Sequence, residues 1–441
     1  MSSLLLILLS SYACQMLQAT RRRLPPGPVP LPVIGNLLDV ASRLPPRSLA
    51  RLAERYGPLM MLRLGSAVVI VASSPAAARE VLRTHNGSIT GRNAPDAWNG
   101  AGHAANSVFV LPPRRRWRAL RQVGTEHLLS PRRLDALRPA VRAAVLEMRR
   151  RVSESTAAPV EVGRVAFEAM ADLMWRAMFS SGLDVATLGE LHGVAREAVL
   201  LALTPNVSDF FPTLAALDLQ GVRRGMATQM GRVYELIDQE IDKRRRGPET
   251  GSRDLLEVML ETDQGNIDGV VMNRDTMRAF LTTCVECSDI DNLPYHQAVV
   301  KETLRLHAVV PLVPNKVENP VEIHGHTIPK GSTVIVNLWA IHRSAEVRTD
   351  PSKFIPERFL GKEFHFQGTE DFEFMPFSAG RRICLGLPLA TRMLHVLLGS
   401  LLKDFEWTLP EKAMENGLDM SEKLGLTMSM ATPLDAIVKG M

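Results

Sequence analysis

The sequence predicts a mainly α-helical protein with small antiparallel β-sheets, organised as a single large domain behind an N-terminal membrane anchor. Apolar residues recur at helical spacing through much of the chain, whereas β-branched residues gather in two short stretches. Beyond residue 36 the sequence contains no internal repeat, low-complexity tract or second pronounced linker. With 441 residues and 46% hydrophobic content the chain can bury a large core, so we expect a folded domain.

The first 36 residues divide into two predicted segments. Residues 1–20 are predicted to be a membrane anchor, because the apolar run 4–17 is followed directly by the three arginines 21–23. This run is shorter than the ~20 residues that span a bilayer, so a signal peptide or a buried helix stays an alternative. Residues 21–36 form a basic, proline-rich hinge, and the positive-inside rule places the body, residues 37–441, in the cytosol.

Secondary structure in the body is predicted from two kinds of periodicity. Apolar residues lie on one helical face in segments 134–148 and 233–241, with arginines and carboxylates opposite, which predicts core-facing amphipathic helices. In segments 59–72 and 321–337, β-branched runs flank glycine-centred turns and predict hairpins of a small sheet.

Charge and cysteine content limit the classes of partner. The net charge of +5 is spread along the chain in short arginine runs, such as 114–116 and 244–246, with no concentrated basic tail. This pattern favours an acidic protein or a membrane surface as partner and argues against nucleic acid. Four cysteines at uneven spacing do not form a disulfide framework, so a reducing compartment fits best.

The stretch "FSAGRRICLG", residues 377–386, places a cysteine in a basic loop directly before an apolar helix. A zinc site is not expected, because Cys384 has no second cysteine or histidine at the usual ligand spacing. A single cysteine can instead be the protein ligand of haem iron, where its thiolate favours O–O cleavage. A buried cysteine in an ordinary loop is the alternative, but it does not explain the glycines and arginines around it.

Three features near Cys384 suit a haem thiolate: two glycines, the start of a helix and an arginine. Gly380 and Gly386 permit unusual backbone angles that direct amide N–H groups toward sulfur. A helix beginning near Leu387 adds its positive N-terminal end, which lowers the pKa of a thiol. The planar guanidinium of Arg382 matches the carboxylate of a haem propionate.

These residues carry a resemblance to a known family. Phe377, Gly380, Arg382, Cys384 and Gly386 occupy every fixed position of F-x-x-G-x-R-x-C-x-G, so the loop resembles the haem-binding loop of the cytochrome P450 superfamily. Three further patterns follow the order of that family: "KETLR" with Glu302 and Arg305, "PERF" with Arg358, and "WRALR" with Trp117 and Arg121. Segment 206–221 resembles the plant branch of geraniol-hydroxylase-like enzymes that oxidise terpenoids.

The resemblance implies a haem-thiolate monooxygenase with haem b iron as cofactor, ligated by Cys384. It further implies that Arg121, Trp117 and Arg382 hold the propionates, although a basic surface helix is an alternative for the first two. An NADPH-dependent reductase would supply electrons, and a small lipophilic, terpenoid-like substrate would be oxidised at the endoplasmic reticulum membrane. The pocket is expected near Trp98, Phe109, Phe210 and 309–313, residues that could equally belong to the ordinary core.

Glu302, Arg305 and Arg358 have a separate predicted role. On a solvated helix, Glu302 and Arg305 would stabilise by only ~0.2–0.5 kcal/mol. With Arg358 as third member, as in the family, they would form a buried structural network under the haem-binding loop. Another departure concerns Asn315, which stands where the family commonly has a basic residue near a propionate; Lys316 is the expected substitute.

The family pattern breaks in the region that should activate oxygen. Segment 274–282, "RDTMRAFLT", resembles the start of the long distal helix, but its A/G-G-x-D/E-T motif is missing. The 22 positions from Phe280 to Glu302 would span ~33 Å if wholly helical, too little for the remaining distal helix and the helices after it. We therefore expect a deletion around residues 282–289, with Thr282, Thr283 or Glu286 as crude substitutes.

Three functional hypotheses remain from the sequence. The first is the monooxygenase, and the second is a catalytically impaired haem-binding remnant, or a splice or gene-model variant, that lacks the oxygen-activating motif. The third is a thiol-redox or zinc protein built on Cys284 and Cys287, which form C-x-x-C without a second cysteine pair or a βαβ context.

Overall fold

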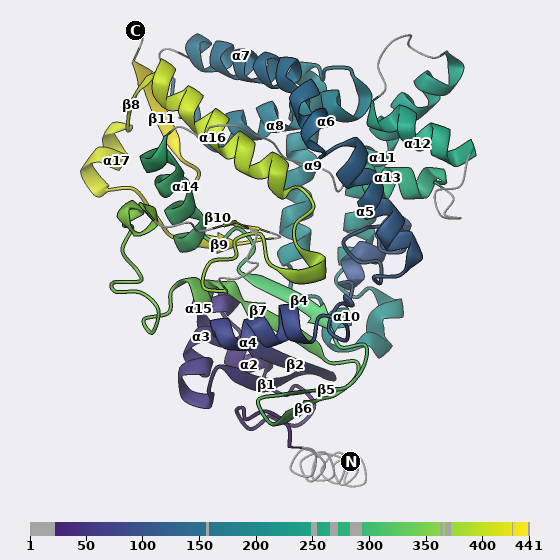
Figure 1. Cartoon of the computed structure of the whole chain (residues 1–441), viewed down its shortest axis with the longest axis vertical. Coiled ribbons are helices and arrows are strands. Elements are labelled where there is room, and N and C mark those ends of the chain that lie inside the picture. The colour runs from purple at the N-terminus through teal and green to yellow at the C-terminus, as the bar shows by residue number, and fades with distance from the viewer. Residues whose placement is uncertain are drawn as a thin grey trace.

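The computed structural model describes residues 23–155, 158–247, 254–264, 272–282, 293–361, 365–366, 372–425 and 427–439. The described chain is mainly helical with small β-sheets, which confirms the predicted fold class (Figure 1). The predicted anchor, residues 1–20, lies outside the described residues. Within the described ranges, none of the helices combines the length and the apolar character that crossing a membrane requires.

The helices follow the chain in this order: α2 (Leu37–Val40), α3 (Pro45–Tyr56), α4 (Pro75–Arg79), α5 (Arg115–His127), α6 (Pro131–Ala136), α7 (Arg138–Glu154), α8 (Val162–Phe179), α9 (Val185–Leu203), α10 (Val207–Phe210), α11 (Val222–Arg246), α12 (Leu255–Gln264), α13 (Arg274–Leu281), α14 (Pro294–Leu306), α15 (Leu338–His342), α16 (Leu387–Asp404) and α17 (Glu411–Asn416).

The strands are β1 (Leu59–Leu64), β2 (Ala67–Ala72), β3 (Val160–Glu161), β4 (Leu312–Lys316), β5 (Val321–Ile323), β6 (His326–Ile328), β7 (Thr333–Asn337), β8 (Glu406–Thr408), β9 (Glu422–Leu424), β10 (Met428–Met430) and β11 (Asp435–Lys439).

The largest sheet has the order β1-β2-β7-β4. The predicted hairpin in segment 59–72 is confirmed, since β1 and β2 pair antiparallel. In segment 321–337 only β5 and β6 form a hairpin; β7 leaves it and pairs parallel with β2 and antiparallel with β4. This parallel pair joins strands far apart in sequence, which local alternation of side chains does not predict.

The two predicted amphipathic helices are present, and one of them is divided. Segment 233–241 lies within α11, where Ile237 and Ile241 are buried. Segment 134–148 spans α6 and α7, which meet at Leu137, because Pro139 occupies the first turn of α7. A proline has no N–H to donate to the preceding turn, so a new helix starts there.

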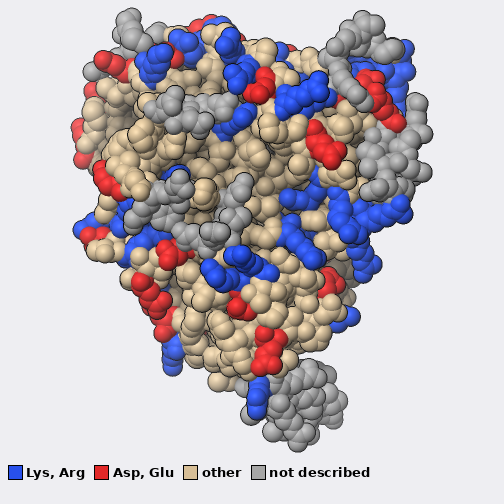
Figure 2. Space-filling view, viewed as in Figure 1, with Lys and Arg blue, Asp and Glu red and all other residues tan. Residues whose placement is uncertain are grey.

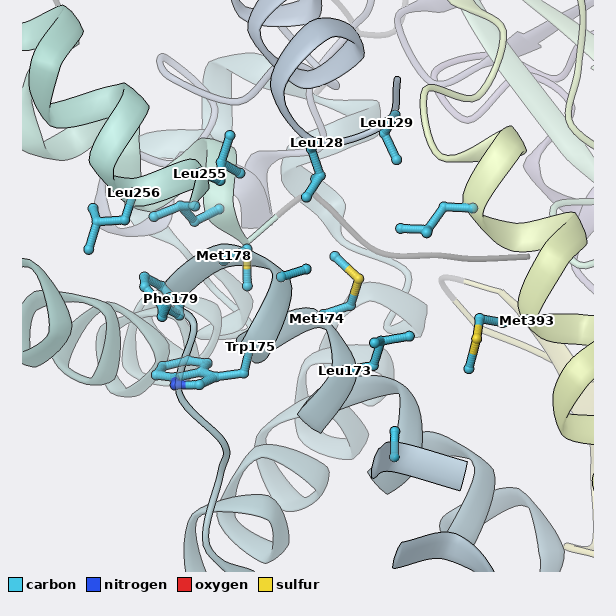
Figure 3. Packing of buried hydrophobic residues seen from close by; sticks show 14 of the residues in the cluster. Leu128, Leu129, Leu173, Met174, Trp175, Met178, Phe179, Leu255, Leu256 and Met393 are labelled. Carbon is cyan, nitrogen blue, oxygen red and sulfur yellow. The ribbon is translucent and has the colours of Figure 1, made fainter. Parts of the chain in front are cut away.

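The main core lies among the helices, and a second apolar cluster surrounds the large sheet. Figure 3 shows side chains of α8 directed toward Leu255 and Leu256 of α12 on one side and toward Met393 of α16 on the other. In Figure 1 the large sheet lies below the helices, and the N-terminal end of α16 points to the region between them. The loop that carries Cys384 therefore sits where helices and sheet meet.

Candidate functional site

The loop 377–386 turns sharply before it enters α16. Ser378 and Gly380 have φ angles of 63° and 71°, in the left-handed region. A Cβ atom built on Gly380 would overlap the carbonyl oxygen of Leu82, so this position requires glycine for both its φ angle and its space. Gly386 differs from the prediction: its φ of −75° and ψ of 0° are ordinary helical values, and it begins α16 as the N-cap residue.

Cys384 lies two residues before that N-cap and is exposed. Its N–H donates a hydrogen bond to the carbonyl of Phe377 over 3.1 Å, which closes the loop on itself. Helix α16 begins three residues after Cys384, so its positive N-terminal end lies near the cysteine in the chain and favours a thiolate.

Two residues of α5 lie against this loop. The Trp117 indole is buried, and its Nε1–H donates to the carbonyl of Val108 over 3.0 Å. The guanidinium of Arg121 stacks 5.1 Å from the Trp117 ring and donates to the carbonyl of Ile383 over 3.1 Å. Burial lowers the pKa of Arg121, and the negative charge of Cys384 opposes this shift. Arg121 is thus electrostatically coupled to the sulfur.

Arg382 is buried, and its guanidinium lies 4.9 Å from the ring of the same indole. It donates hydrogen bonds to four backbone carbonyls, those of Thr90, Val108, Phe109 and Leu111. Burial and the charge of Arg121 lower its pKa to about 10. Arg382 therefore ties the cysteine loop to residues 90–111 while it keeps a positive charge beside Arg121.

A third arginine, which the sequence analysis did not identify, completes this cluster. Arg92 donates to Oδ1 of Asn315 over 3.3 Å and lies 5.2 Å from the Phe109 ring. Burial and the charge of Arg382 lower its pKa to about 9. Its Nε and the Nδ2 of Asn315 are buried without a hydrogen-bond partner among the described residues. Two buried donors of neighbouring side chains are therefore unsatisfied by the described protein groups.

Strand geometry explains why Arg92, and not Lys316, stands beside Asn315. Asn315 and Lys316 are neighbours in β4, so their side chains project from opposite faces of the strand, and Asn315 is the buried one. The Lys316 N–H donates to the Gly91 carbonyl over 2.9 Å. This backbone bridge brings Arg92 to Asn315 although the two lie far apart in sequence. Lys316 as substitute for the basic residue of the family stays a prediction.

Arg92, Arg121 and Arg382 form what we call the arginine cluster. Burial lowers the pKa of each, and pairwise repulsion adds to the shift for Arg92 and Arg382. Gathering three cations in this way costs free energy unless an anion is bound among them. The donor set fits a ligand with two carboxylates, and the adjacent exposed Cys384 fits an iron ligand, so together they fit haem.

The predicted acidic network lies behind the cysteine loop. Glu302 accepts two hydrogen bonds from Arg305 over 2.6 and 2.7 Å, and both side chains are fully buried. Arg305 also donates to the carbonyls of His342, Pro351 and Lys353. Arg358 approaches Glu302 at 3.5 Å as an ion pair. The network thus joins α14 to segment 342–358 through backbone carbonyls.

The predicted pocket residues divide into two groups. Trp98 stacks on Phe109 at 5.2 Å, and Phe109, Val309 and Val310 remain exposed at 40%, 41% and 40%. These three apolar side chains can line a substrate pocket. Val313, by contrast, is buried in the core around the large sheet, and the carbonyl of Phe210 accepts a hydrogen bond from Ser66 in the β1–β2 turn.

Segment 274–282, which resembles the start of the distal helix of the family, contains helix α13. Helix α13 covers eight residues, and the next described element, α14, begins at Pro294. Phe280 is buried near Gly124 of α5 and Leu385 of the cysteine loop. The Thr282 hydroxyl donates to the carbonyl of Arg278, so it is bonded within its own helix. The other expected substitutes, Thr283 and Glu286, and the pair Cys284 and Cys287 lie outside the described residues.

Comparison with known proteins places this geometry in context. The family model described as cytochrome P450 matches residues 25–284 and 264–432, and the two matches overlap over residues 264–284. Geraniol 8-hydroxylase from Swertia mussotii is 37% identical over 464 positions, covering 94% of this chain and 93% of the relative. Cytochrome P450 76C3 from Arabidopsis thaliana is 36% identical over 471 positions, with 94% and 91% covered.

A third relative, 7-ethoxycoumarin O-deethylase from Helianthus tuberosus, is 36% identical over 460 positions, covering 94% of this chain and 93% of its own length. All three alignments are longer than the 441 residues of this chain. The relatives therefore carry residues that have no counterpart here.

Proposed function

Because this chain belongs to the cytochrome P450 family, we propose that it is a haem-thiolate monooxygenase that inserts one atom of O2 into a small lipophilic, terpenoid-like substrate. The arginine cluster beside the exposed Cys384 is the observation that carries this proposal. The buried, partnerless Nε of Arg92 and Nδ2 of Asn315 call for an anionic partner. A haem group presents its propionates and its iron on one rigid frame.

Each residue then has a distinct role. When bound, haem b supplies the iron at which O2 is activated. Cys384 would be the protein ligand of the haem iron, stabilised as a thiolate by the N-terminal end of α16 and by the charge of Arg121. Arg92, Arg121 and Arg382 would bind and orient the propionates. Glu302, Arg305 and Arg358 hold the surrounding backbone and have no catalytic role.

The substrate class rests on the pocket residues and on the relatives. The exposed side chains of Phe109, Val309 and Val310 offer apolar contacts to a substrate. Two of the relatives are named geraniol 8-hydroxylase. We propose terpenoid alcohols of that size as substrates and use geraniol as the probe below.

Electrons would come from an NADPH-dependent reductase. Figure 2 shows basic side chains gathered on the right of this face, where Figure 1 places α5. The exposed residues there include Arg114, Arg115 and Arg118. A basic surface next to the helix that contacts the cysteine loop suits an acidic redox partner. The N-terminal apolar run supports a location at the endoplasmic reticulum membrane.

A second candidate function is a haem-binding protein with impaired turnover. It is favoured by the eight residues of α13 and by alignments that exceed the length of this chain. Such a protein would keep the cysteine and arginine half of the site but lack the distal acid and threonine that the family uses to deliver protons. The two candidates share haem binding and differ in how tightly oxygen reduction is coupled to product.

The reduced, carbon-monoxide-bound spectrum of the full chain tests the shared part. We expect a thiolate-type Soret band that is lost in Cys384→Ala. Cys284→Ala and Cys287→Ala are the matched controls and should leave the band unchanged; its loss in either variant would show that haem ligation does not depend on Cys384 alone. A wild-type chain that takes up no haem would overturn both candidate functions. Product formed from geraniol per NADPH consumed, with a reductase present, then separates the enzyme from the impaired form.

A further inference from the structure

The buried carboxylate of Glu422, at the start of β9, forms hydrogen bonds with four side chains. Oε2 of Glu422 accepts hydrogen bonds from Arg47 over 2.8 Å and from the Trp339 indole over 3.3 Å. Oε1 lies 3.1 Å from Nη2 of Arg343 and 3.3 Å from Nδ1 of His307. The Glu422 side chain is 5% exposed, and its four partners come from α3, α15 and the segments that follow α14 and α15.

The charges around Glu422 are arranged to hold it ionised. Burial alone would raise its pKa, but hydrogen bonds from His307 and Arg47, the charge of Arg343 and the Trp339 indole lower it to about 2. Arg343 also stacks 4.3 Å from the Trp339 ring, so the cation is fixed by both the carboxylate and the indole. Charge-assisted hydrogen bonds of this kind are stronger than neutral ones and fix geometry. We call these five residues the Glu422 cluster.

The cluster anchors the β9–β10 hairpin to the segment that leads into β4. The hairpin touches this segment at two points: through Glu422 to His307, and through the Met428 N–H, which donates to the Val309 carbonyl over 2.7 Å. Val309 and Val310 lie next to these two bonds in the chain, and their side chains are exposed. The hairpin therefore sets the position of these two side chains.

The other end of the hairpin reaches α9. Gly425 approaches Val199 so closely that a Cβ built on it would lie 2.7 Å from Cγ1 of the valine. In Figure 1 β9 and β10 lie between α14 and α9, above β4. A shift at the base of the hairpin would accordingly move both its contact with α9 and the 309–310 segment.

We infer that Glu422 is a positioning residue for substrate selection: its cluster locks the β9–β10 hairpin, which fixes the wall formed by Val309 and Val310 against which an apolar substrate packs. This inference rests on the proposed function, because it assumes that these valines face the substrate. It assigns Glu422 no contact with substrate or cofactor. A displacement of about 1 Å in a positioning element can change the fit of a ligand severely.

Glu422→Gln tests the inference, since it keeps the size of the side chain and removes its charge. Glu415→Gln, on the exposed surface of α17, is the matched control. The full chain is compared in two measurements that need no haem: amide hydrogen exchange of the peptide covering 421–431, and equilibrium dialysis of geraniol and of 7-ethoxycoumarin. The ratio of the two dissociation constants distinguishes a displaced wall from a general loss of stability, which would weaken both ligands equally.

For Glu422→Gln we expect hairpin exchange to become about tenfold faster and the ratio of dissociation constants to change about tenfold, a difference of ~1.4 kcal/mol between the ligands. Glu415→Gln should change neither. Unchanged exchange, an unchanged ratio, or a wild-type chain that binds neither ligand would overturn the inference. Should Glu422→Gln fail to fold, Glu422→Asp keeps the charge and should give the same two changes in smaller measure. The carbon-monoxide spectrum of the wild type separately reports the proposed haem function.

Discussion

The ring of His342 accepts a hydrogen bond on Nε2 from the N–H of Met375 over 3.1 Å. This bond links the end of α15 to the segment that leads into the cysteine loop, and the carbonyl of His342 accepts a second bond from Arg305. His342 thereby connects the Glu302 network to the cysteine loop, through its carbonyl on one side and its imidazole on the other. Because Nε2 must accept, the ring has to be neutral.

This requirement predicts how stability depends on pH. Burial and the charges of Arg348, Arg305 and Arg343 lower the pKa of His342 to about 3, below its ordinary value of 6.5. Between these values the unfolded chain binds a proton that the folded chain does not, so stability rises as the pH rises from 3 to 6.5. Each pH unit contributes at most ~1.4 kcal/mol.

In His342→Gln, whose amide oxygen can accept the same bond, the rise in unfolding free energy between pH 5 and 6.5 should be smaller than in the wild type. Urea unfolding at three pH values measures it, with His127→Gln, a partly exposed histidine of α5, as control. Equal slopes in His342→Gln and the wild type would contradict the prediction.

The second prediction concerns the buried ion pair of the same network. Glu302→Ala leaves the guanidinium of Arg305 buried without its carboxylate, which should cost ~3–5 kcal/mol of unfolding free energy. The matched control is Asp135→Ala, which removes the exposed partner of Arg138 and should cost less than ~1 kcal/mol. Denaturant unfolding compares the two, and limited proteolysis reports Glu302→Ala if it is too unstable to purify. Similar losses in both variants would show that the buried network is not structural.

The parts of the site that could be predicted from sequence are those whose residues are neighbours in the chain. The cysteine loop, the Trp117 and Arg121 pair and the Glu302 and Arg305 pair each lie within one short segment, so spacing alone brings their side chains together. The helical class and the β1–β2 hairpin follow from local periodicity in the same way.

Contacts between residues far apart in the sequence could not be predicted from spacing and local periodicity. Arg92 reaches Asn315 only because Gly91 bridges to β4, and Glu422 gathers donors from segments separated by hundreds of positions. A lone arginine or glutamate in a polar stretch carries no local signal for either arrangement. The parallel pairing of β2 with β7 has the same origin.

Arg92 supplies the third prediction, in which stability and cofactor retention change in opposite directions. Without an anion, its buried charge is repelled by Arg382, so Arg92→Gln should leave the haem-free chain as stable as the wild type or more stable. With haem bound, the variant loses a propionate donor and should release haem about tenfold faster, a loss of ~1.4 kcal/mol. Arg114→Gln, an exposed position of the same charge, is the control.

Transfer of haem to an apo-globin acceptor measures the release rate, and thermal unfolding of the haem-free chain measures stability. A variant that loses stability without haem and retains haem normally would show that Arg92 serves only the fold.

The last prediction concerns proton delivery near helix α13, which resembles the start of the distal helix. Helix α13 ends at Leu281 with the Thr282 hydroxyl bonded to the carbonyl of Arg278, so this threonine does not present a free hydroxyl for proton delivery. We expect most NADPH consumed by the native chain, with reductase and geraniol present, to appear as hydrogen peroxide. Replacing residues 282–292 by a longer segment that carries the A/G-G-x-D/E-T motif should supply the missing acid and threonine. Product per NADPH should then rise at least about tenfold, since a positioned proton donor contributes roughly 10²–10⁴ in rate.

The same insertion with its motif threonine replaced by valine, which keeps the helix and removes the hydroxyl, should restore the fold but not the coupling. Tight coupling in the native chain would mean that the residues present already deliver protons efficiently, and the impaired candidate would be wrong.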